Sequence, residues 1–99
     1  MNKTLHTEQQ QLFLARLKDA RQEAGLSQIE LAARLGMRQS DISKCERGVR
    51  RLDVIELRSW IEALNISFPN FAADLDARLT DLAKRNARSR PPRAKAGGT

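Results

Sequence analysis

The sequence predicts an all-α fold, a single domain of five helices followed by a short basic tail. Three observations predict it. A chain of 99 residues has the length of one domain. Apolar residues recur at helical spacing between glycine, serine and proline boundaries, and no segment alternates as a strand would. Residues 88–99 hold no large apolar side chain, so we expect residues 1–87 to fold and residues 88–99 to be a disordered basic tail.

The first two helices are expected over residues 8–24 and 28–35. The first ends before Gly25 and carries an apolar stripe of Leu12, Phe13, Leu17, Ala20 and Ala24. Ser27 and Glu30 have the spacing of a capping box, in which the Ser27 hydroxyl accepts from the Glu30 amide and the Glu30 carboxylate accepts from the Ser27 amide. Gly36 can adopt the positive φ that ends the second helix.

The third helix is expected at about 39–46, separated from the second by only three residues, 36–38. Its inner side carries Ile42 and Cys45, and Gly48 follows its end. Two short helices around such a glycine-containing turn are typical of a helix-turn-helix, here over residues 28–47.

The last two helices are expected at about 53–64 and 69–85. Asn65 can cap the fourth helix in a left-handed conformation, and Pro69 suits the first turn of the fifth. The apolar stripe of the fourth consists of Leu52, Val54 or Ile55, Leu57, Ile61 and Leu64. The stripe of the fifth consists of Phe71, Leu75, Leu79 and Leu82.

The composition argues against several classes of protein. One cysteine, Cys45, and one histidine, His6, provide neither a disulfide framework nor a metal cluster, and we expect no cofactor. An enzyme is disfavoured because no nucleophile has a base and no glycine-rich phosphate loop exists. No apolar run has the length of a signal-peptide core or a membrane span, so we expect a cytoplasmic protein.

The charge is basic overall and unevenly distributed. The net charge is +6, and residues 34–52 hold six basic and two acidic side chains, a net charge of +4. Residues 53–83 hold two basic and six acidic side chains, a net charge of −4, and the last sixteen residues carry +6. A membrane-surface peptide fits the tail charge but lacks a basic amphipathic helix with large apolar residues. The pattern suits a protein that contacts a polyanion such as nucleic acid with one face.

Two strings resemble a known family. Residues 26–36 (LSQIELAARLG) and 39–48 (QSDISKCERG) closely resemble the Xre family of helix-turn-helix regulators, which includes the phage lambda-type repressors and Cro proteins. The resemblance covers about Leu14 to Leu64. It implies a compact five-helix, lambda-repressor-like domain that binds double-stranded DNA, usually as a homodimer.

The resemblance implies base contacts by the third helix. Gln39, Ser40 and Lys44 match the positions from which the family's recognition helix reaches base edges, and Ser43 and Asp41 are weaker candidates. Gln39 can bond adenine and Lys44 can bond guanine O6 and N7. The alternative is an ordinary polar surface.

It also implies phosphate contacts. Gln28 matches a residue that bonds a phosphate at the start of the second helix, and its alternative is a solvated glutamine. Arg47, Arg50 and Arg51 lie where the family's following loop grips phosphates. Arg38 stands where relatives commonly have a Ser or Thr N-cap, so a phosphate can replace the missing cap beside Arg38.

Three residues are interpreted as structural. Arg21 and Glu46 match family positions that form a partly buried ion pair between the first helix and the recognition helix. Cys45 stands where the family usually has leucine or isoleucine, and we interpret it as a small buried hydrophobe rather than a redox switch.

The function that follows is a sequence-specific transcriptional regulator, a dimeric repressor that reads a palindromic operator. The predicted dimer interface is the stripe Phe71, Leu75, Leu79 and Leu82, and the alternative is that the first helix covers this stripe with Leu5 or Leu12. A second hypothesis is an antitoxin-like protein that binds a toxin through its basic tail or the Phe68/Phe71 region and represses its own operon with another surface. A controller of a restriction-modification system is a variant of the first hypothesis.

Overall fold

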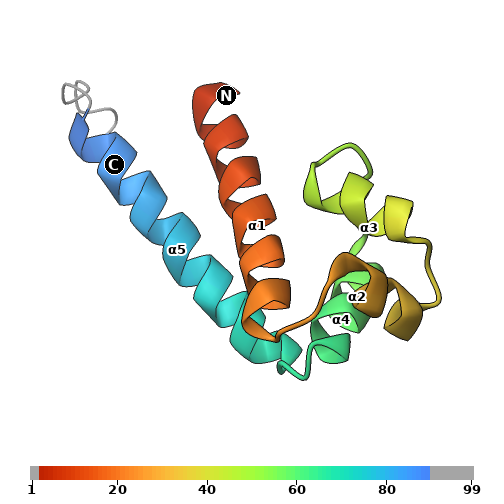
Figure 1. The fold of residues 1–99 in the computed structure, drawn as a ribbon. Helices are drawn as coiled ribbons and strands as arrows, with labels where there is room; N and C mark the ends of the chain where they lie inside the picture. The colour runs from red at the N-terminus through yellow and green to blue at the C-terminus, as the bar shows by residue number, and fades with distance from the viewer. Residues whose placement is uncertain (1–2, 90–99) are drawn as a thin grey trace.

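The structure is a computed structural model that describes residues 3–89, and this part of the chain consists of helices and short connections (Figure 1). The helices are α1 (Lys3–Glu23), α2 (Gln28–Leu35), α3 (Gln39–Glu46), α4 (Val54–Ala63) and α5 (Phe68–Ser89). No strand occurs between residues 3 and 89, so the all-α prediction with five helices is confirmed. None of these five helices combines the length and the apolar character that crossing a lipid bilayer would need.

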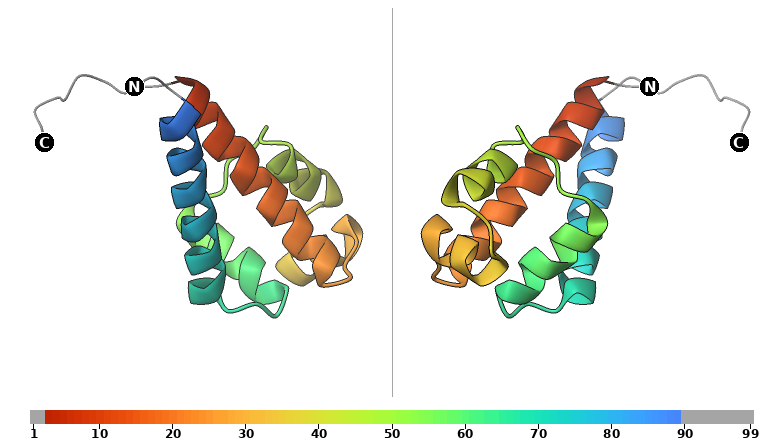
Figure 2. Two further views of the ribbon diagram at one scale, coloured as in Figure 1. Left: turned by 90° about the vertical axis from the view of Figure 1, so that its left-hand side faces the viewer. Right: turned by 90° about the vertical axis from the view of Figure 1, so that its right-hand side faces the viewer.

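The long helix α1 lies between α5 on one side and the α2–α3 pair on the other (Figures 1 and 2). Helix α4 contacts both α2 and α5 and so closes one end of the bundle. At the other end the start of α1 meets the end of α5, where Asn86 Nδ2 donates to Glu8 Oε1 at 2.9 Å. Each face of α1 therefore supports a different part of the molecule.

The core joins these elements through fully buried side chains. Those without exposed surface include Leu17 of α1, Leu31 of α2, Ile42 of α3, and Trp60 and Ile61 of α4. Burying side chains of this size stabilises the fold by roughly 1.5–3 kcal/mol each. The inner side of α3 is thus held in place by packing against α1 and α2.

Two helices are longer than the sequence predicts. Helix α1 begins at Lys3 rather than residue 8, because residues 3–7 contain neither glycine nor proline and the helix extends ahead of the apolar stripe that begins at Leu12. Helix α5 ends at Ser89 rather than residue 85, supported by alanines and by an ion pair between Arg85 and Asp81 at 3.3 Å. The predicted disordered tail is therefore wrong at residues 88 and 89, and residues 90–99 lie outside the described residues.

The predicted face of α4 is wrong in part. Val54 and Ile55 are 62% and 69% exposed, whereas Trp60 is fully buried. Relative to the predicted stripe, the helix is rotated about its axis so that Trp60 and Ile61 face the core. Asp53, predicted to be the first residue of the helix, is its N-cap. Asn65 has the expected left-handed φ of 62°.

The stripe on α5 is divided between core and surface. Phe71 is 3% exposed, so it cannot contact a partner while the domain is folded, whereas Phe68 is half-buried against the core. This removes Phe71 from the predicted dimer interface and from the predicted partner segment. Leu75, Leu79 and Leu82 are half-buried beside α1, and the Leu5 side chain lies outside the described residues.

Candidate nucleic-acid interface

The helix-turn-helix is defined by the local signals that the sequence shows. Ser27 Oγ accepts from the Glu30 amide at 3.0 Å, and Glu30 Oε1 accepts from the Ser27 amide at 2.8 Å. Gly36 has a φ of 67°, and its amide and that of Met37 donate to carbonyls of the last turn of α2. Only Met37 and Arg38 separate this left-handed residue from the start of α3 at Gln39. The predicted capping box and turn are confirmed.

Helix α3 has one buried and one exposed side. Ile42 and Cys45 are 0% and 2% exposed and point into the core. The opposite side carries the exposed side chains Gln39, Ser40 and Lys44, with Ser43 half-buried at its edge. The residues predicted to contact bases therefore share one accessible face.

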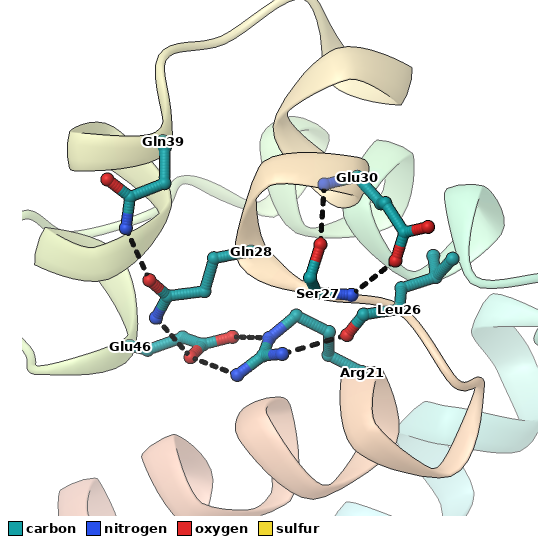
Figure 3. A network of polar contacts seen from close by, with 7 residues as sticks. All are labelled: Arg21, Leu26, Ser27, Gln28, Glu30, Gln39 and Glu46. Carbon is teal, nitrogen blue, oxygen red and sulfur yellow. Dashed lines mark hydrogen bonds and ion pairs between the residues drawn. The ribbon is translucent and has the colours of Figure 1, made fainter.

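A buried ion pair joins α3 to α1 (Figure 3). Arg21 Nε donates to Glu46 Oε2 at 2.7 Å and Arg21 Nη2 donates to Glu46 Oε1 at 3.1 Å. The same guanidinium donates to the Leu26 carbonyl at 2.8 Å. The two charged side chains are 9% and 3% exposed, so this predicted pair holds the end of α3 in a fixed position.

Gln28 extends this network to the start of α3 (Figure 3). Its Nε2 donates to Glu46 Oε1 at 3.1 Å, and its Oε1 accepts from Gln39 Nε2 at 2.6 Å. The sequence predicts that Gln28 contacts a phosphate, but one of its two side-chain N–H groups and its side-chain carbonyl are used within the protein. The Gln28–Gln39 bond was missed, although two glutamines at the first positions of successive helices were a visible signal.

The basic residues of the 34–52 segment differ in their surroundings. Arg34 Nη1 donates to the Ala63 carbonyl at the end of α4 at 2.8 Å, and Arg50 is engaged by Cys45 and Glu56. The remaining cations, Arg38, Lys44, Arg47 and Arg51, are exposed. Arg38 is the N-cap residue of α3, and its side chain accepts no hydrogen bond from the first turn, as expected.

Two carboxylates near this surface have perturbed acidity. Hydrogen bonds from the Ser27 amide and hydroxyl hold the pKa of Glu30 below its ordinary value of 4.5. The pKa of Glu56 is lowered in the same way, mainly by the hydrogen bond from the Asp53 amide and to a smaller extent by that from the Arg50 guanidinium. Both groups act as helix caps. Within residues 3–89, no three histidine, cysteine, aspartate or glutamate side chains gather as metal ligands.

Comparisons with known proteins agree with this geometry. A helix-turn-helix family model (HTH_3) matches residues 17–71, which include α2, α3 and α4. A solved structure of an XRE-family like protein from Pseudomonas syringae pv. tomato str. DC3000 is 42% identical, with a TM-score of 0.71. The similarity covers 77% of this chain and 93% of that one. The comparison with curated proteins finds no match. The chain therefore belongs to the Xre/Cro-like helix-turn-helix family, which is a family of DNA-binding proteins and not of enzymes.

Proposed function

We propose that the protein is a cytoplasmic, homodimeric transcriptional repressor that reads a palindromic operator. The observation that carries this proposal is the face of α3 that presents Gln39, Ser40 and Lys44, because its inner side is locked to α1 by the Arg21–Glu46 pair. A helix whose last turn is held in this way can enter the major groove in a defined orientation. Ser43 lies at the edge of the same face.

Phosphate contacts come from the cations around this helix. Arg38, Arg47 and Arg51 are exposed on either side of the base-contacting face. The Gln28 amide has one further N–H to offer beside them. Such contacts supply affinity and salt dependence but carry no sequence information.

The proposed dimer interface is the exposed part of α5. Leu75 and Leu79 line a hollow of about 280 Å³ between α5 and α1, together with Phe13 and two glutamines. Leu82 is half-buried one turn further along. A second copy packed by a two-fold operation would fill this hollow and place two recognition helices in successive major grooves.

Selection of bound sites from a random DNA pool tests the proposal. We expect an enriched palindrome whose half-sites lie about 10 base pairs apart, one turn of the double helix. The double variant Gln39→Ala/Lys44→Ala is the matched control, and it should recover a weaker or altered motif while its thermal unfolding stays unchanged. Failure of the folded wild-type protein to enrich any motif would contradict the proposal.

A further inference from the structure

Three arginines at the end of the recognition helix have different surroundings. Arg47 is exposed and its Nε donates to Ser43 Oγ at 3.3 Å. Arg51 is exposed and has no hydrogen bond or ion pair to another residue in the range 3–89. Arg50 is half-buried, and two other side chains hold its guanidinium. The sequence alone predicts the same phosphate contact for all three.

Arg50 joins the end of α3 to the start of α4. Its Nη1 donates to Cys45 Sγ at 3.3 Å and its Nη2 donates to Glu56 Oε2 at 2.8 Å. Its backbone amide donates to the Lys44 carbonyl at 3.2 Å. Cys45 lies in the last turn of α3 and Glu56 in the first turn of α4. One residue in the middle of the loop thus contacts both helices.

The partner carboxylate is itself fixed. Glu56 Oε1 accepts from the Asp53 amide at 3.1 Å, and Asp53 Oδ1 accepts from the Glu56 amide at 2.7 Å. Contact with Cys45 and with Glu56 raises the pKa of Arg50, and the Asp53 amide and then the Arg50 guanidinium lower the pKa of Glu56, so both members of the pair are charged at neutral pH. The guanidinium therefore meets a carboxylate that is already oriented by a capping box.

Packing beneath the loop is incomplete. A hollow of about 230 Å³ lies between the loop and α1, lined by Phe13, Leu14, Cys45, Arg50 and Leu52 among others. At one end the loop touches α1 closely, because a Cβ at Gly48 would lie 2.8 Å from Leu14 Cδ1. Beyond that point the polar contacts of Arg50, together with the packing of Leu52 against the core, fix the path of the loop.

We propose that Arg50 is a positioning residue, which sets the last turn of α3 and with it Lys44 and does not itself bind a phosphate. This inference rests on the proposed DNA-binding function. The exposed neighbour Arg51 provides the matched comparison, because it carries the same charge in the same loop.

The first test compares the salt dependence of binding to the selected operator. Arg51→Gln should lower the log-log salt slope by about 0.9 and weaken binding to selected and random DNA alike. Arg50→Gln should leave the slope unchanged and reduce the preference for the selected site by at least about fivefold, the lower end of typical coupling between sites. Arg50→Lys should not restore the preference, because one ammonium cannot span both Cys45 and Glu56.

The second test uses Glu56, for which the two roles of Arg50 predict opposite signs. If Arg50 bound a phosphate, Glu56→Gln would remove a negative charge and release the arginine, and DNA binding would become tighter. If Arg50 positions α3, Glu56→Gln should reduce the preference as Arg50→Gln does. The double variant Arg50→Gln/Glu56→Gln should then be no worse than either single variant.

Amide chemical shifts of the free protein complete the test, after thermal unfolding has shown that each variant is folded at the measuring temperature. Arg50→Gln and Glu56→Gln should both shift the amides of Lys44 to Gly48, and Arg51→Gln should not. Unchanged shifts there, a slope lowered by Arg50→Gln, or tighter binding by Glu56→Gln would each overturn the inference. A wild-type protein that selects no DNA would overturn the proposed function instead, and the chemical shifts would still decide whether Arg50 positions α3.

Discussion

Single side chains on α3 and in the following loop are expected to act on DNA in two distinguishable ways. Gln39→Ala and Lys44→Ala should each relax the choice of base at one position of the operator, at a cost of about 1–3 kcal/mol in binding free energy. Arg51→Ala should weaken binding to every sequence by a similar factor, because phosphates are the same everywhere. Titrations against the selected site, its point variants and random DNA measure both effects. Equal losses on all DNA for all three variants would contradict the assignment.

The buried ion pair makes a second prediction at the level of single residues. Arg21→Ala leaves Glu46, whose side chain is 3% exposed, without its charged partner. We expect the free energy of unfolding to fall by about 3–5 kcal/mol, the usual cost of breaking a buried pair. Arg85→Ala is the control, because its pair with Asp81 is exposed and should contribute less than about 1 kcal/mol. Chemical denaturation measures both, and a similar loss for the two variants would be the contrary result.

At the scale of elements, the caps of α2 and α4 make stability depend on pH. The folded pKa of Glu30 lies below its ordinary value of 4.5, so the carboxylate stabilises the fold above that pH. This contribution is lost as the pH falls through the lowered pKa. Glu30→Gln should therefore be less stable than wild type at pH 7, and the difference should shrink as the pH falls through the lowered pKa of Glu30. Glu23→Gln, which removes a carboxylate that caps no helix, is the control, and a constant difference for Glu30→Gln would be evidence against the cap.

Elements with local signals were predictable, and so was the inner face of α3, but the rotation of α4 about its own axis was not. Ser27, Glu30 and Gly36 act on neighbouring backbone groups, so their spacing sufficed to place both ends of α2. On α4, however, a stripe can be drawn through Ile55 as easily as through Trp60, and only packing against the other helices selects Trp60. The same holds for Arg50, whose partner Glu56 lies in another element. The residues of the site were therefore predicted, and so was the Arg21–Glu46 pair through the family resemblance, but the contacts of Gln28 with Gln39 and of Arg50 with Glu56 required the fold.

For the whole molecule, the central position of α1 connects the DNA-facing unit with the proposed dimer surface. One side of α1 holds α3 through Arg21, and another faces α5 around Phe13. A partner packed against α5 would therefore have its two-fold axis fixed relative to α3 by a single straight helix. The spacing of half-sites in the operator follows from this geometry.

Charged substitutions on α5 test this arrangement. Leu79→Glu/Leu82→Glu should give a folded monomer that no longer binds the palindrome, because carboxylates cannot be buried at an apolar interface without a large cost. Ala77→Glu/Thr80→Glu adds the same charge at exposed positions of the same helix and should leave the dimer intact. Analytical ultracentrifugation and DNA titration measure both. A dimer that survives the leucine changes would refute the interface, and an unfolded chain would show that α1 alone covers the stripe.

Because α2 and α3 are capped unequally, their first turns should differ in how often they unfold locally in the free protein. Helix α2 is closed by a capping box at one end and a left-handed glycine at the other, whereas Arg38 provides no side-chain cap for α3. In hydrogen–deuterium exchange, the Asp41 amide at the third position of α3 should therefore exchange faster than the Glu30 amide at the third position of α2, which donates to Ser27 Oγ. The first turn of α3, with Gln39 and Ser40, would thus order fully only on DNA, and part of the binding free energy would be spent on ordering it.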